Sequence, residues 1–172
     1  ITKAERRQPS VSAPNALWFG DTKGGLVTYE AAGDANATVL DATIQLRIAK
    51  LVGAEAPLLQ LGIRIPAYGT CYVTLETITG TLILQSHCGK PDQNPYVKVL
   101  QSLPASLDFV SVHMVADFKE GHTTVTFNNT SPATLDHNAT EPGGGKPVVT
   151  FGAEEGKGST EIGYDDMLIT AQ

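Results

Sequence analysis

Acidic side chains are the first residues in this chain that could do chemistry. Hydrolysis of a glycosidic bond with retention needs two carboxyl groups about 5 to 5.5 Å apart. Alternate positions of one strand supply that separation, because they share a face. The nearest acidic groups, Glu154-Glu155 and Glu161 with Asp165-Asp166, have the wrong spacing or lie at turns. The spacing therefore argues against a carboxylate-pair hydrolase.

The sequence contains few patterns that are typical of metal-binding sites. The four histidines (His87, His113, His122, His137) lie far apart in the sequence, and no zinc-protease, nucleophile-elbow or phosphate-loop motif occurs. Oxygen-rich turns could hold calcium, although Asp and Asn also cap turns without any metal. We expect no required cofactor, with a structural calcium ion as the one candidate. These turns are Gly20-Asp21-Thr22, Asp34-Ala35-Asn36, Asp92-Gln93-Asn94 and Asp136-His137-Asn138.

Asp165 and Asp166 pose a separate problem, because neighbouring strand residues face opposite sides. One carboxylate must then face the core unless the strand is bulged, and an unpaired buried carboxylate is costly. We expect it to be held by hydrogen bonds, by an arginine such as Arg47 or Arg64, or by calcium. Either way it would tie the last strand to the fold.

Four glycosylation motifs of the form Asn-x-Ser/Thr occur, at Asn36, Asn128, Asn129 and Asn138, all in or beside predicted turns. In a eukaryotic secreted protein they would carry glycans, and in a bacterial one they would be ordinary turn residues.

The elements that must position these residues are predicted to be strands. The 172 residues include 17 Gly and 10 Pro, only 17% are charged, and apolar stretches alternate with turn signals throughout. The segment 42–54 could be helical but also alternates as a strand, and its context favours the strand. We predict residues 1–15 to be a flexible lead-in or linker and residues 16–172 to be one all-β domain.

Charge argues against nucleic acid as a partner, and the length of the apolar runs argues against a membrane span. The net charge is −6, and Arg6-Arg7 is the only basic cluster, so the stripe of cations that nucleic acid requires is missing. No apolar run approaches the roughly 20 residues that would cross a membrane as a helix. We expect neither nucleic-acid binding nor a membrane span, and the oligomeric state stays open.

The segment Cys71 to Cys88 predicts a β-hairpin. It alternates with period two on both sides of Thr79-Gly80, and a two-residue loop there places Cys71 opposite Cys88. Counting outward from the loop makes them a non-hydrogen-bonded pair with Cα atoms about 4.5 Å apart, close enough for a disulfide. The alternative is two free core cysteines, and the register favours the disulfide.

The same register sorts the side chains into two faces. Cys71, Val73, Leu75, Leu82 and Leu84 are predicted to face the core. The outer face then carries Tyr72, Thr74, Glu76, Gln85 and His87.

A second hairpin follows further along the chain. The strand 109–118 buries alternate residues and leaves Ser111, His113 and Asp117 outside, and a turn at Glu120-Gly121 leads to a partner strand at 123–128. The last two strands are predicted at 148–152 and 162–170.

Two stretches resemble the laminin-G-like and concanavalin-like sandwich superfamily. SLDFVSVHMVADFKEGHTTVTFNN is similar to that superfamily's internal hairpin, and VVTFGAEEGKGSTEIGYDDMLIT looks like its closing hairpin. The resemblance implies a two-sheet antiparallel jelly-roll sandwich, often with a structural calcium ion. It also implies a structural role for Asp165-Asp166.

Alginate-lyase-like members of that fold use an arginine, a Gln-x-His strand and a tyrosine. Gln85-Ser86-His87 has the Gln-x-His form, and Tyr72 lies opposite His87 in the predicted register. The companion Arg-x-Glu-Leu and Tyr-Lys-x-Gly-x-Tyr motifs are missing, so a histidine on an exposed face is the favoured interpretation.

We therefore expect a secreted or cell-surface module, or a periplasmic one in a bacterium, that binds a glycan or an extracellular protein in a lectin-like or adhesion role without catalysis. The alternatives are a polysaccharide lyase or glycoside hydrolase working from the concave sheet, and a purely structural domain of a larger surface protein. The candidate binding residues on the outer polar face are Tyr72, Glu76, Gln85, His87, His113 and Asp117.

Overall fold

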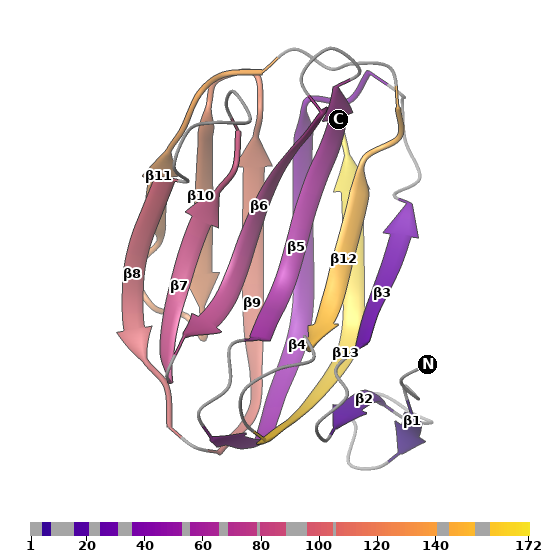
Figure 1. Cartoon of the computed structure of the whole chain (residues 1–172), viewed down its shortest axis with the longest axis vertical. Helices are drawn as coiled ribbons and strands as arrows, with labels where there is room; N and C mark the ends of the chain where they lie inside the picture. Colours follow the sequence, from indigo (N-terminus) through magenta and orange to yellow (C-terminus); the bar gives the residue numbers. More distant parts are fainter. Residues whose placement is uncertain are drawn as a thin grey trace.

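The computed structural model of the chain describes residues 5–7, 16–20, 25–30, 36–52, 56–65, 69–78, 80–88, 96–104, 106–140, 145–153 and 159–172. Within these ranges every regular element is a β-strand. The strands form two antiparallel sheets that lie face to face, which is the jelly-roll sandwich that the sequence predicts (Figure 1). In these ranges no helix is long and apolar enough to span a membrane.

The sheet in front in Figure 1 has six strands, and the sheet behind it has seven. In spatial order the six are β3 (Gly25–Glu30), β12 (Val148–Ala153), β5 (Ala56–Ile65), β6 (Gly69–Ile78), β7 (Thr81–Ser86) and β8 (Tyr96–Ser102). The seven are β1 (Glu5–Arg7), β2 (Ala16–Gly20), β13 (Ser159–Ala171), β4 (Val39–Val52), β9 (Leu107–Asp117), β10 (His122–Phe127) and β11 (Ala133–Asp136).

Strand alternation builds the core between the sheets. In β9, alternate residues from Val110 to Ala116 are buried and the residues between them are partly exposed, as the sequence pattern predicts. The ambiguous segment at 42–54 is strand through Val52, and its alternate residues Leu40 to Ile48 are buried in the same core. A helix would have turned these side chains to several directions, whereas a strand points them all at the facing sheet.

One buried hydrogen bond joins the sheets near the core's edge. The Tyr164 hydroxyl of β13 donates to the Gly152 carbonyl of β12 at 2.7 Å, and burial raises the pKa of Tyr164. A buried carbonyl without a partner would cost free energy, so this bond secures an irregular end of β12, where Gly152 has a φ of 148°.

One expectation needs correction. The strands at the end of the chain do not form a closing hairpin, because β12 lies in the six-stranded sheet between β3 and β5 while β13 lies in the other sheet between β2 and β4. Within the predicted lead-in, β1 pairs with β2 through Glu5↔Trp18, Arg6↔Leu17 and Arg7↔Ala16. Backbone pairing at a sheet edge can recruit residues that lack any apolar period. The domain boundary itself stays a prediction.

Candidate functional site

The hairpin of β6 and β7 positions most of the candidate residues. Its pairs run from Ile78↔Thr81 to Val73↔Ser86, so the predicted register around Thr79-Gly80 is confirmed. The disulfide between Cys71 and Cys88 is also confirmed, with Cα atoms 4.4 Å apart. Both cysteines are buried in the core. Since neighbouring strand residues alternate, Tyr72 and His87 must face the other way.

Three side chains on that outer face form a hydrogen-bonded cluster. Thr74 Oγ1 donates to Glu76 Oε1 at 2.7 Å, and Gln85 Nε2 donates to the same oxygen. Glu76 and Gln85 are partly buried, and Thr74 is buried beneath them. Two donors on one carboxylate oxygen fix the side-chain positions and leave the other oxygen of Glu76 as an acceptor site.

An aromatic pair lies next to this cluster. The rings of Tyr72 and His87 are stacked, with centroids 4.3 Å apart and planes inclined by 18°, and the His87 amide donates to the Tyr72 carbonyl at 2.9 Å. Burial lowers the pKa of His87 from its ordinary 6.5, and the nearby Glu76 carboxylate partly offsets this. The imidazole is therefore mainly neutral at pH 7, and it can accept or donate a hydrogen bond.

His113 and Asp117 do not join this surface. Both belong to β9 in the seven-stranded sheet, where they face outward on the opposite side of the sandwich. His113 Nε2 lies 2.9 Å from Asp41 Oδ1, and Asp117 Oδ1 accepts the Glu120 amide at 2.9 Å in the adjoining turn. The six candidate binding residues thus divide into a four-residue surface, formed by β6, β7 and His87 directly after β7, and two residues on β9.

Neither Asp165 nor Asp166 faces the core. The expectation that one of the two carboxylates points inward is therefore wrong, because β13 is bulged at this position. The pairing of β13 with β4 shifts between Asp165↔Gln45 and Leu168↔Thr43, which inserts one extra residue into β13. Asp166 takes a positive φ of 46° and is exposed, and its amide donates to Asp165 Oδ1 at 3.0 Å. Arg47, one proposed partner, instead pairs with Asp108, with Nε and Oδ1 3.2 Å apart.

Metal ligands do not gather in the part of the chain that the structure describes: no three His, Cys, Asp or Glu side chains meet there. At Asp136-His137-Asn138, His137 turns inward and contacts Thr123 Oγ1, and Asn138 Oδ1 accepts the Tyr96 hydroxyl. The turns at 21–22, 34–35 and 92–94 lie outside the described residues.

The four glycosylation-motif asparagines are all exposed. Asn128 and Asn129 form the turn between β10 and β11 with φ values of 49° and 60°. Asparagine tolerates this left-handed conformation better than most residues, which gives these two a conformational role independent of any glycan.

Sequence reasoning left Thr74 out of the candidate binding residues, although it completes the Glu76 cluster. Its position two residues before Glu76 on the same strand face was the available signal. The Lys98 and Gln101 side chains of β8 were also missed; both stand at inward register positions of an edge strand, where polar side chains are unusual.

Comparison at the sequence level identifies no relative: no family model matches the chain, and no curated protein matches it.

Solved structures share its fold. Alginate lyase A1-II′, a member of polysaccharide lyase family 7, superposes with a TM-score of 0.66 at 11% identity, over 94% of this chain and 82% of the lyase. Alginate lyase AlgAT5 of the same family gives 0.59 at 11% identity, over 91% and 78%. The binding domain of botulinum neurotoxin DC in complex with SialylT gives 0.56 at 14% identity, over 98% of this chain and 43% of that one. At such identities the likeness establishes the fold alone.

Proposed function

We propose that this chain is a glycan-binding module that engages its ligand with the outer face of β6 and β7. The observation that carries the proposal is the stacked Tyr72–His87 pair next to the Thr74–Glu76–Gln85 cluster. The flat rings offer area to the apolar C–H face of a sugar, and the carboxylate and amide offer acceptors and donors to its hydroxyls. Both sets lie on a rigid hairpin that a disulfide closes.

Charge favours a neutral sugar over a uronate. Glu76 places a carboxylate in the middle of this surface, and among the side chains described on β6 and β7 no Lys or Arg balances it. A ligand carboxylate would meet this charge in a partly buried setting, where like charges repel more strongly than in water. The Glu76 oxygen Oε1 already accepts a hydrogen bond from the Gln85 side-chain amide.

A polysaccharide lyase is the second candidate, favoured by Gln85 and His87 of the Gln-x-His sequence lying on the outer face, with Tyr72 stacked on His87. Neutral His87 could take the proton next to a uronate carboxyl group while Tyr72 donates one to the departing glycosidic oxygen. The carbon–oxygen bond would break and a carbon–carbon double bond would form. Gln85 would neutralise the uronate carboxyl, yet its amide is already engaged by Glu76, which weighs against this reaction.

The proposed location is extracellular or on a cell surface, and in a bacterium the periplasm. The Cys71–Cys88 disulfide supports it, because such bonds persist mainly in oxidising compartments. A structural calcium ion stays part of the proposal for the turns outside the described residues, and an extracellular protein is the alternative partner.

The test is a titration of the chain with a panel of neutral and uronate oligosaccharides, in which binding is measured by calorimetry or by amide NMR shifts. We expect a neutral glycan to bind and to shift amides at 72–76 and 83–87. Tyr72→Ala should weaken binding at least about tenfold, which corresponds to about 1.4 kcal/mol.

His113→Ala is the matched control, since it removes a half-exposed imidazole from the opposite sheet face and should leave the affinity unchanged. Ultraviolet absorbance of a new double bond on uronate polymers, lost in His87→Ala, would establish the lyase instead. Absence of binding across the panel would contradict the glycan proposal and leave a structural domain.

A further inference from the structure

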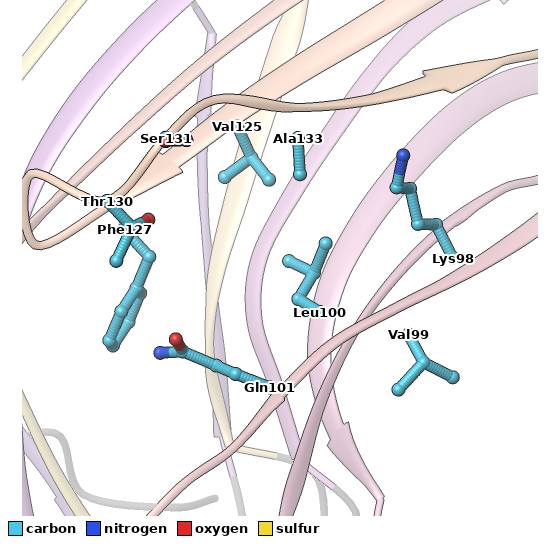
Figure 2. Close-up of a pocket in the computed structure, with 9 residues that line it drawn as sticks. All are labelled: Lys98, Val99, Leu100, Gln101, Val125, Phe127, Thr130, Ser131 and Ala133. Atoms are coloured by element: carbon cyan, nitrogen blue, oxygen red, sulfur yellow. The ribbon is translucent and has the colours of Figure 1, made fainter.

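A cavity of about 280 Å³ opens at the edge of the sandwich where β8 of one sheet lies beside β11 of the other (Figure 2). It lies between the sheets, whereas the Tyr72–His87 surface lies on the outside of one sheet. Side chains from β8, β10, β11 and the turn that joins β10 to β11 line it. The space is therefore separate from the surface proposed to bind a glycan.

A bulge in β8 shapes one wall. The pairing with β7 shifts between Leu82↔Gln101 and Ile83↔Val99, so that Leu100 is the extra residue. Leu100 and Gln101 then both point into the cavity, and Val99 points away from it with 64% of its surface exposed (Figure 2). The bulge therefore places two consecutive side chains, Leu100 and Gln101, on the wall of the cavity.

The floor of the cavity is apolar. Val125 and Phe127 of β10 are 2% and 5% exposed, and Ala133 of β11 pairs in register with Val125. Leu100 packs against the same core from β8. These side chains carry no hydrogen-bonding group, so they favour an apolar body over a ring that carries many hydroxyls.

The mouth carries one cation. Lys98 stands at an inward register position opposite Leu84, and its exposed ammonium donates to the Thr134 carbonyl at 2.8 Å. An ammonium has three N–H donors, so two remain for a ligand. None of the nine lining residues is acidic, and Gln101, Thr130 and Ser131 add neutral polar groups. The lining therefore has a net positive charge and suits an anion.

We propose that this edge cavity binds a small organic carboxylate whose body is one aromatic ring or a short branched chain. The carboxylate pairs with Lys98, and the apolar body lies against Leu100, Val125 and Phe127. The volume supports this size, because pockets for larger ligands occupy about 300 to 1,000 Å³. The inference goes beyond the glycan proposal and does not depend on it.

Amide NMR of the whole chain titrated with phenylacetate tests the inference, with 2-phenylethanol as the neutral ligand of similar shape. We expect saturable shifts at 98–101 and 130–134, and binding of the alcohol at least about tenfold weaker. Lys98→Met keeps the length of the side chain and removes its charge, so it should weaken phenylacetate binding at least about tenfold. Lys119→Met, in the exposed turn after β9, is the charge-matched control and should not change the affinity.

Ala133→Leu provides a second variant, because added side-chain volume should block the cavity while leaving the Lys98 charge in place. Equal binding of acid and alcohol, equal affinity in Lys98→Met, or tighter binding of a methyl glucuronide at these residues would overturn the inference. Shifts confined to 72–87 would also overturn it, and would leave the glycan proposal standing.

Discussion

Single histidines show how local surroundings set chemistry in this fold. His137 is 8% exposed, with Nε2 3.1 Å from Thr123 Oγ1 and Nδ1 3.1 Å from the Asn138 carbonyl. The carbonyl can only accept, so Nδ1 carries the proton and Nε2 accepts from the threonine. Burial lowers the pKa of His137, although that same carbonyl and the charges of Asp136 and Asp117 act to raise it while His122 lowers it further.

The lowered pKa of His137 predicts acid sensitivity. Between its folded pKa and the ordinary 6.5 the unfolded chain binds more protons, so this contribution to stability is complete above about pH 6.5 and is lost as the pH falls. The slope from one histidine cannot exceed about 1.4 kcal/mol per pH unit. Denaturant unfolding from pH 7 to pH 5 should show this loss.

His137→Asn should make that slope shallower. The pKa of His87 is lowered as well, so His87→Gln should remove a further part of the slope. A His137 variant with the parent's full pH dependence would contradict the assignment.

At the scale of elements, the β6–β7 hairpin is fixed from both ends. At one end, a two-residue loop sets the register at Ile78↔Thr81. At the other end, the hairpin is closed by the disulfide between Cys71 and Cys88, which are 17 residues apart in the sequence. The bond restricts the unfolded chain, and it holds Tyr72 and His87 in their backbone pairing. The geometry of the proposed binding surface therefore depends on this crosslink.

Replacing both cysteines by alanine should lower the free energy of unfolding by up to about 3 kcal/mol, which is the chain-entropy value for a loop of this length. The melting temperature of a domain of this size should then fall by up to about 6 to 12 °C, since each kcal/mol shifts it by about 2 to 4 °C. Mass measurement with and without reductant confirms the bond, and the parent melted in reductant is the control. Two free thiols after purification under oxidising conditions would refute it.

At the scale of the whole molecule, the sandwich separates residues that one sequence pattern treats alike. β6 and β9 both alternate polar and apolar residues, yet their polar faces lie on opposite outer surfaces because the strands belong to different sheets. The edge of the seven-stranded sheet is formed by β1, which pairs with β2 through three residue pairs. Such a short edge strand contributes little to the core.

Deletion of residues 1–15 should therefore leave the sandwich folded and lower its melting temperature by only a few degrees, since a loss of about 1 kcal/mol shifts a domain of this size by about 2 to 4 °C. Circular dichroism and an amide NMR spectrum measure this. A variant of the 172-residue chain with glycine at positions 5 to 7 distinguishes the effect of losing β1 from the effect of losing the rest of residues 1–15. An unfolded truncated chain would show that the domain begins before residue 16.

Sequence alone determined the features that depend on local periodicity. Alternation gave the strands around Val110 and Ile44, and the same alternation about Thr79-Gly80 predicted the Cys71–Cys88 bond and the outward direction of Tyr72, Glu76, Gln85 and His87. These follow because the two-residue period of a strand and the mirror register of a tight hairpin need no knowledge of distant partners.

Tertiary structure decided everything that depends on which sheet a strand joins. It placed His113 and Asp117 away from His87, separated β12 from β13, and let a bulge turn both Asp165 and Asp166 away from the core. It also formed the cavity between β8 and β11 from residues that lie up to 35 positions apart, Lys98 to Ala133. Sheet membership is a long-range choice set by packing, and the alternating pattern of a strand is the same in either sheet.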